Sequence, residues 1–214
     1  MTPRRVKAWL LALTAALILS TLVLTAYSQW DLPATCREVP KLSEGVVVGL
    51  IADTHVHLPY VRGVLPRRAV EVFREANVSL IIHAGDVVDP SIIYELSRVA
   101  PVIVVWGNAD PPELRRTLST VEVVKVDGYR VGVTHVLGIP PLWNHPKVER
   151  LIEGLDLDVL VFGHTHKPLL KEYGDVLLVN PGSPVDPMPP FLVKPTVALL
   201  VLGKEGVEVY FVEV

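Results

Sequence analysis

Four short runs of aliphatic and β-branched residues constrain the fold of this chain more than any other feature. They lie at residues 46–51, 80–82, 102–105 and 159–162. Strands that are apolar on both faces are typical of central strands covered by helices on each side. Segments with apolar residues at helical spacing separate the first three runs, at residues 66–76 and 91–99. This alternation predicts an α/β fold.

The remainder of the chain is richer in strands. Asp127-Gly128 is typical of a tight hairpin turn, here between strands at residues 121–126 and 130–134. We also expect a short helix at residues 147–155 and strands at 169–173, 176–179, 196–202 and 207–214. An α/β part joined to a mostly antiparallel part predicts two stacked mixed β-sheets flanked by helices, a four-layer sandwich. In such folds functional side chains gather at the carboxyl ends of strands.

An uncharged run at residues 8–27 precedes this domain. About 20 apolar residues are needed to cross a bilayer, so the run predicts one N-terminal transmembrane helix. Basic residues before it, and Tyr27 and Trp30 at its end, are typical of membrane interfaces. We therefore predict a signal anchor over residues 1–30, a Pro-containing linker over 31–44 and the main domain over 45–214. More basic residues precede the run than follow it, which predicts that the main domain lies on the extracytoplasmic side of the membrane.

Two alternatives for the N-terminal run are a buried core helix and a cleaved signal peptide. A core helix of five turns would be expected to show a polar face, which this run lacks. Small residues at Ala26 and Ser28 are compatible with cleavage, which would leave a secreted protein. The run is longer than the usual apolar region of a signal peptide, which favours a retained anchor.

Composition excludes several classes of protein. Half of the residues are hydrophobic and 20% are charged, which excludes a disordered chain. A single cysteine, Cys36, excludes an intrachain disulfide and a multi-thiolate metal site. The first 44 residues carry five of the 20 Lys and Arg and three of the 23 Asp and Glu, which leaves residues 45–214 with a net charge of −5. The 19 prolines, together with few Asn and Gln, are typical of a thermophile.

Polar side chains that can bind metals follow five of the predicted strands. A single Asp or His at a strand end is usually a cap, a turn former or a structural residue. Five such ends in one fold, with glycines nearby to allow close packing, instead indicate one metal site. The residues are Asp53, His55, Asp86, Asn108, His135, His164 and His166.

As an ordered set, these segments resemble the signature blocks of the calcineurin-like metallophosphoesterases, and the compact layout resembles the YfcE-like phosphodiesterase branch. The resemblance covers residues 45 to about 183 and ends with Asn180-Pro181-Gly182-Ser183. It implies two metal ions, one held by Asp53, His55 and His166. The other would be held by Asn108, His135 and His164, with Asp86 bridging both. It also implies catalytic roles for Asp86, Asn108 and His135.

The resemblance predicts a metal-dependent phosphodiesterase. Oxygen and imidazole ligands suit divalent Mn, with Ni, Co, Fe or Zn as alternatives. A hydroxide bridging two such ions would attack phosphorus in line, and the ions would neutralise the developing charge. The expected partners are a small phosphate-ester substrate and, through the N-terminal helix, a membrane. The sequence does not indicate an oligomeric state.

Two positions depart from the family pattern. Ala109 follows Asn108, where relatives carry a histidine or a cysteine, and alanine cannot protonate a leaving group. His135-Val136-Leu137 stands where this branch has His-Gly-His. Among the remaining residues, we expect His83 to be buried and to orient the ligands. Asp110 is expected either to fix the Asn108 loop or to cap a helix. His57 is either a phosphate-binding residue or a solvated loop residue, and His145, in a loop, has no expected role other than substrate contact.

Two other functions compete with the phosphodiesterase hypothesis. The retromer subunit of this fold is a protein-binding scaffold with a degraded metal site, and Ala109 slightly favours such a role, whereas the complete ligand set argues against it. A nuclease of the same superfamily would need several phosphate contacts from Lys or Arg. The net charge of residues 45–214 argues against that function and against nucleic acid as a partner.

Overall fold

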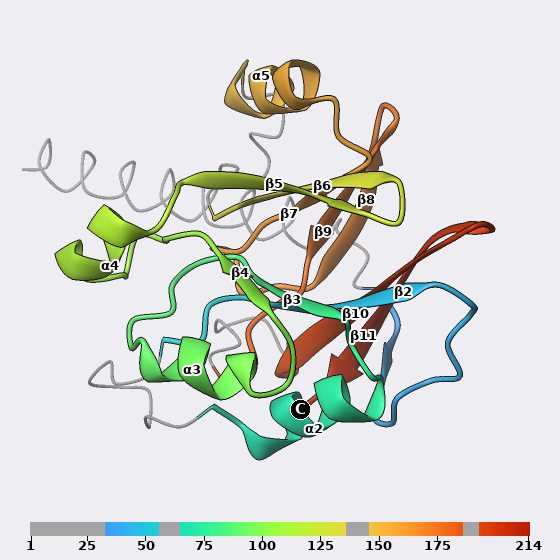
Figure 1. The fold of residues 1–214 in the computed structure, drawn as a ribbon, viewed down its shortest axis with the longest axis horizontal. Coiled ribbons are helices and arrows are strands. Elements are labelled where there is room, and N and C mark those ends of the chain that lie inside the picture. Colours follow the sequence, from blue (N-terminus) through green and yellow to red (C-terminus); the bar gives the residue numbers. More distant parts are fainter. Residues whose placement is uncertain (1–32, 56–64, 136–145, 186–192) are drawn as a thin grey trace, which may run out of the picture.

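The structure is a computed structural model that describes residues 33–55, 65–135, 146–185 and 193–214. Two mixed β-sheets stack face to face, and helices cover the outer face of each (Figure 1). The first sheet has the order β1-β11-β10-β2-β3-β4, and the second has the order β5-β6-β7-β9-β8. Helices α2 and α3 lie outside the first sheet and α5 lies outside the second (Figure 1). The predicted α/β sandwich is therefore confirmed.

The strands of the first sheet are β1 (Thr35–Cys36), β2 (Val46–Ile51), β3 (Leu80–His83), β4 (Val102–Val104), β10 (Thr196–Gly203) and β11 (Gly206–Glu213). Those of the second are β5 (Val121–Val126), β6 (Tyr129–Thr134), β7 (Val159–Val161), β8 (Leu169–Tyr173) and β9 (Val176–Asn180). The helices are α2 (Arg67–Glu75), α3 (Ser91–Ser97), α4 (Pro112–Thr117) and α5 (Pro146–Leu155).

Parallel pairing within each sheet brings the polar strand ends together. β2, β3 and β4 are parallel neighbours in the first sheet, and β6, β7 and β9 are parallel neighbours in the second. Neighbouring parallel strands end at the same edge of a sheet. The carboxyl ends of both groups meet where the two sheets are stacked, which places the loops that follow β2, β3, β6 and β7 beside one another.

Three apolar clusters fill the spaces between the four layers. Val48, Leu50, Ile82 and Val131 belong to the cluster between the sheets. Other residues of β2 and β3, such as Ile51 and Ile81, pack with α2 and α3. Leu160 and Leu178 pack with α5. The central strands β2, β3, β7 and β10 are thus largely buried on both faces, which is the physical reason for their continuous apolar sequences.

The structure differs from the sequence expectations at two elements. Residues 35 and 36, which the sequence assigns to the linker, form β1 and pair with β11 in parallel. Apolar contacts attach this segment, since Cys36, Val39 and Leu42 pack against the cluster that also contains α2 and α3. Helix α4, between β4 and β5, was not expected, because its short sequence has little helical periodicity.

The predicted membrane span at residues 8–27 lies outside the described residues, as do His57 and His145. Within the part of the chain that the structure describes, no helix has the length and apolar character needed to span a membrane.

Candidate metal centre

The predicted ligands come together from both sheets. Asp53 and His55 follow β2 and Asp86 follows β3, while His135 follows β6 and the loop after β7 carries His164 and His166. Several contacts join the sheets at this edge. The backbone N–H of His164 donates to both carboxylate oxygens of Asp53, at 3.1 and 3.0 Å. His135 Nδ1 lies 2.7 Å from the carbonyl oxygen of Ala84.

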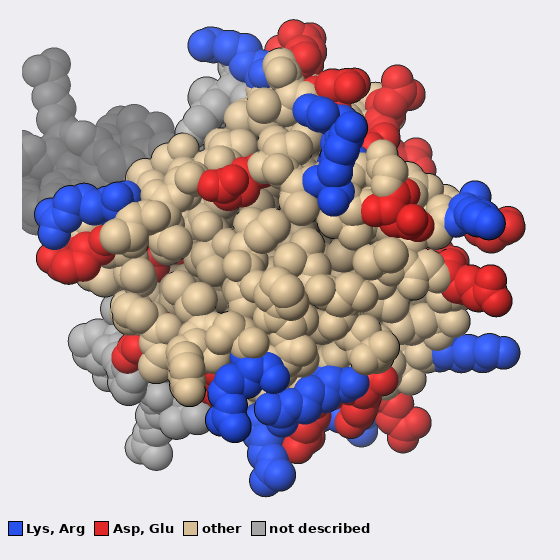
Figure 2. Space-filling view, in the orientation of Figure 1, with Lys and Arg blue, Asp and Glu red and all other residues tan. Residues whose placement is uncertain are grey.

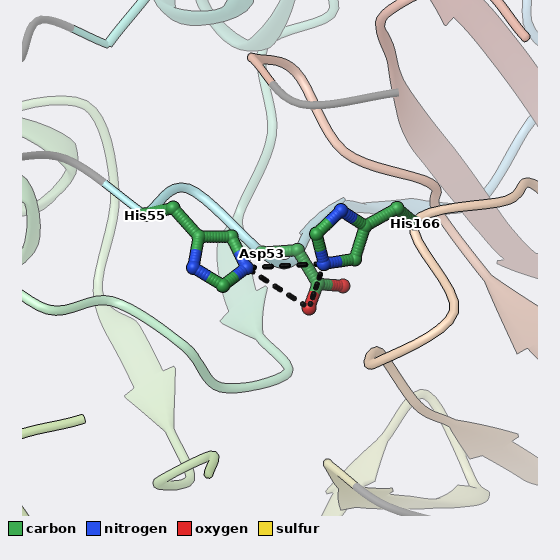
Figure 3. A group of neighbouring side chains, drawn as sticks. All are labelled: Asp53, His55 and His166. Atoms are coloured by element: carbon green, nitrogen blue, oxygen red, sulfur yellow. Dashed lines mark hydrogen bonds and ion pairs between the residues drawn. The ribbon is translucent and has the colours of Figure 1, made fainter. Parts of the chain in front are cut away.

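The first group of ligands consists of Asp53, His55 and His166, all buried. His55 Nε2 and His166 Nε2 lie 3.0 Å apart. Asp53 Oδ1 lies 3.8 Å from His55 Nε2 and 3.4 Å from His166 Nε2. Figure 3 shows these three atoms directed toward a common point. Such an arrangement matches what a metal ion needs from one carboxylate and two imidazoles.

The second group consists of Asp53, Asp86 and His135, also buried. His135 Nε2 lies 3.2 Å from Asp86 Oδ2 and 3.9 Å from Asp53 Oδ1. Asp86 Oδ2 also lies 3.6 Å from His55 Nε2. In this arrangement Asp53 belongs to both groups, and Asp86 lies between His135 and His55. The two groups are thus one continuous cluster.

Two other predicted ligands lie beside the second group. The His164 ring meets the His135 ring edge to face, with centroids 5.4 Å apart. Asn108 is exposed on the loop after β4, and the next residue, Ala109, donates its N–H to Asp86 Oδ1 at 2.6 Å. This hydrogen bond holds the Asn108 loop against the Asp86 side chain.

The local backbone of the ligand loops is unusual. Asp53, His55, Asp86, His164 and His166 have φ angles of 53°, 43°, 56°, 72° and 55°. Residues other than glycine rarely adopt this left-handed conformation, and each instance costs on the order of 1–3 kcal/mol. The surrounding hydrogen bonds must offset this cost. Five occurrences among the seven predicted ligands indicate a function that requires the geometry.

Further polar residues hold the ligand loops in place. Asp110 is buried and its carboxylate accepts hydrogen bonds from the N–H groups of Asp86, Val88 and Gly107, at 3.1, 2.6 and 2.7 Å. Of its two predicted roles, the structure therefore shows the one that fixes the Asn108 loop. His83 is buried, as expected, and its Nε2 lies 3.1 Å from Thr54 Oγ1. Thr54 stands in the sequence between the predicted ligands Asp53 and His55.

The turn after β9 supports the centre from the second sheet. Ser183 Oγ donates to the carbonyl oxygen of Asp53 at 2.7 Å. Asn180 Nδ2 donates to the carbonyl oxygen of Gly163 at 2.8 Å, which holds the start of the His164 loop. Sequence reasoning placed both residues in a family block but gave them no role, because these contacts join segments far apart in the chain.

Burial and nearby charges shift the pKa values of the histidines in different directions. Burial lowers the pKa of His135, but the adjacent Asp86 carboxylate and the charge of Asp53 outweigh burial and raise this pKa to about 9. Burial lowers the pKa of His83 to about 4, so that ring is neutral. The pKa of His164 is also lowered, first by burial and then by the charge of His135. Asp53 and Asp86 thus keep the His135 ring protonated in the metal-free protein.

The residues present fit divalent metal ions. In each group the ligand atoms lie within 4.8 Å of one another. The buried Nε2 of His135 makes no hydrogen bond of suitable geometry within the described residues, although it lies near Asp86. Buried polar atoms normally have partners, and a coordinated cation would supply one here. The donors are oxygen and nitrogen, which favours Mn, Fe, Co, Ni or Zn over soft metals.

Comparisons with known proteins place the chain among phosphoesterases. Residues 46–205 match the family model described as the calcineurin-like phosphoesterase superfamily domain. A probable metallophosphoesterase of Methanocaldococcus jannaschii is 38% identical over 146 residues, which are 68% of this chain and 71% of that protein. A phosphodiesterase of the same organism is 32% identical over 149 residues, which are 64% of this chain and 82% of that protein.

A solved structure of vacuolar protein sorting 29 from Cryptosporidium parvum has the same fold. The TM-score is 0.62 at 24% sequence identity, over 80% of this chain and 99% of that one. This likeness concerns the arrangement of strands and helices and says nothing about activity.

Proposed function

The chain belongs to the calcineurin-like phosphoesterase superfamily, and we propose on that premise that it is a divalent-metal-dependent phosphodiesterase. One observation carries the proposal. Two buried groups of carboxylate and imidazole ligands share Asp53 and lie at the junction of the two sheets. Stability does not explain a cluster of this kind, because buried charges and left-handed backbone both lower the free energy of unfolding.

We assign the ligands as follows. Asp53, His55 and His166 would hold one ion, Asn108, His135 and His164 would hold the other, and Asp86 would be a ligand of both. Asp53 also lies within reach of the second group. Two divalent ions in such a site, when bound, supply an activated water and stabilise the charge of a phosphoryl transition state. The role of the chain is to place the ligands, to keep His135 and His166 oriented, and to exclude bulk water from the buried carboxylates.

The expected substrate is a small phosphodiester. A relative of this chain is named a phosphodiesterase. Ala109 adjoins Asp86 and offers no proton, so esters with good leaving groups are expected to react fastest. Nucleic acid is disfavoured by charge. On the face shown in Figure 2, most Lys and Arg side chains stand near the edge of the molecule with Asp and Glu beside them, and the broad middle of this face carries few of them.

The test uses the full-length protein and bis-p-nitrophenyl phosphate, with Mn²⁺ and with the other candidate ions. Wild type is expected to hydrolyse the diester only when a divalent ion is present. Asp86→Asn should lose this activity, because it removes a charged ligand of the second group. Asp127→Asn is the matched control, since Asp127 lies in the β5–β6 turn and Asn tolerates its φ of 49°.

Two results would contradict the proposal. One is a wild-type protein that binds the ions and hydrolyses no ester, which would favour the protein-binding scaffold. The other is an Asp86→Asn variant that is as active as Asp127→Asn.

A further inference from the structure

We propose that Arg115, on helix α4, is a positioning residue that fixes the turn carrying Asn108. It thereby sets the affinity of the second group of ligands for its metal ion. This inference rests on the proposed function, because it takes Asn108 as a ligand. Arg115 belongs to none of the motifs found in the sequence. Its role is visible only in the folded chain.

The contacts of the Arg115 guanidinium converge on this turn. Nε donates to the carbonyl oxygen of Asp110 at 2.7 Å, and Nη2 donates to the carbonyl oxygen of Asn108. The guanidinium carbon also lies 5.3 Å from the centroid of the Trp106 ring, where a cation–π contact holds it. A planar fork that bonds two carbonyls fixes both position and orientation, which a lysine ammonium does not.

The other side of the turn is held from within the centre. The Asp110 carboxylate bonds the amides of Gly107 and Asp86, and the Ala109 amide bonds Asp86 Oδ1. Asn108 itself is exposed and lies between these anchored residues. Its carbonyl is anchored by Arg115. Anchoring the backbone on both sides of Asn108 fixes the direction of its Cα–Cβ bond, so Arg115 helps to set where this side chain leaves the turn.

This role is one of positioning rather than of folding. Arg115 is an exposed residue, and contacts of exposed charged side chains contribute little to stability. The neighbouring Arg116 provides a comparison on the same helix. Its side chain is 71% exposed and pairs at 3.2 Å with Glu113 of the same helix.

The experiment measures Mn²⁺ binding to the full-length protein by equilibrium dialysis and by the electron paramagnetic resonance of free Mn²⁺. The variants are Arg115→Gln, Arg115→Lys and, as control, Arg116→Gln. Arg115→Gln is expected to bind one ion as wild type does and the other roughly 10- to 100-fold more weakly, the usual effect of losing a group that orients a ligand. Arg115→Lys should recover part of this loss, and Arg116→Gln should match wild type.

The thermal midpoint in chelator separates positioning from a general loss of structure. The proposal holds if Arg115→Gln keeps the wild-type midpoint, loses affinity for one ion and regains hydrolysis at saturating Mn²⁺. It is overturned if Arg115→Gln binds both ions with wild-type affinity, or if both affinities and the midpoint decrease together. A wild type that binds two ions but hydrolyses no ester would refute the proposed function alone, because the binding comparison does not depend on turnover.

Discussion

At the scale of single residues, the centre depends on very close approach of backbone and side chains. Asp53 is fully buried and contacts three histidines and the His164 amide. Glycines make room for this crowding. A methyl group on Gly163 would lie 2.7 Å from the Ala84 carbonyl oxygen and 2.9 Å from Asp53 Oδ2 and from His135 Nδ1. Real side chains do not approach so closely, so residue 163 has to lack one.

Gly163→Ala is therefore expected to destabilise the domain by about 1–3 kcal/mol and to weaken metal binding. Gly154→Ala is the matched control, because a methyl group there meets nothing within 4 Å and lies on α5. It should add about 0.5–1 kcal/mol of stability through helix propensity. Urea unfolding in chelator measures the change in stability of both variants. A Gly163→Ala variant as stable as wild type would contradict this account of the packing.

The protonation of His135 leads to a second prediction at this scale. Because its pKa is about 9, His135 carries a proton in the metal-free protein near pH 7.5. A histidine ligand has to be neutral at the coordinating nitrogen, so metal binding should release about one proton from this ring. The release should decline as the pH rises toward about 9. Calorimetry in buffers with different ionisation enthalpies measures it, and an enthalpy independent of the buffer would refute it.

At the scale of elements, the loops after β3 and β4 behave as one unit. Asp110 connects them through the amides of Asp86, Val88 and Gly107.

Local signals in the sequence predicted some elements well, such as the hairpin of β5 and β6 with its turn at Asp127-Gly128. They did not predict β1, whose two residues form a strand only because β11 lies beside them.

Asp110→Ala should cost about 3 kcal/mol or more in the free energy of unfolding, because it leaves three backbone amides without an acceptor in a buried region. Asp158→Ala is the control. The Asp158 carboxylate accepts an exposed hydrogen bond from the Arg130 amide at 2.6 Å, and the loss of this bond should cost less than about 1 kcal/mol. Denaturant unfolding of the metal-free proteins gives both values, and equal losses would contradict the role of Asp110.

At the scale of the whole molecule, the centre joins the two sheets. The first sheet supplies Asp53, His55, Asp86 and Asn108, and the second supplies His135, His164 and His166. Bound ions should therefore stabilise the native stacking of the sheets, since an unfolded chain cannot present this set of ligands. The ligand cluster is a product of the tertiary structure, as is the core between the sheets.

Removal of metal is accordingly expected to lower the thermal midpoint. A site filled at a free ion concentration of 100 times its Kd contributes about 2.7 kcal/mol. Asp86→Asn should show a smaller difference between chelator and Mn²⁺ than wild type or Asp127→Asn. Differential scanning calorimetry measures these midpoints, and a wild-type midpoint unaffected by Mn²⁺ would exclude a metal site of this kind.

The membrane anchor also belongs to this scale and stays a prediction. The uncharged run at residues 8–27 is expected to retain the full-length protein in the membrane pellet after alkaline carbonate washing, with release by detergent. Replacing Ile18 and Leu22 by Asp should move the protein to the soluble fraction while metal-dependent hydrolysis is retained. Recovery of the wild type in the soluble fraction after cell breakage would contradict the anchor.

The sequence by itself determined the order of the main strands and the set of candidate metal ligands. Both are local properties: apolar runs define buried strands, and polar residues mark where those strands end. Tertiary structure decided how the set is used. It made Asp53 common to both groups and brought Ser183 to the Asp53 carbonyl across 130 positions in the chain. It also placed Arg115 against the Asn108 turn. These contacts depend on the stacking of two sheets and on loop conformations, which no local pattern specifies.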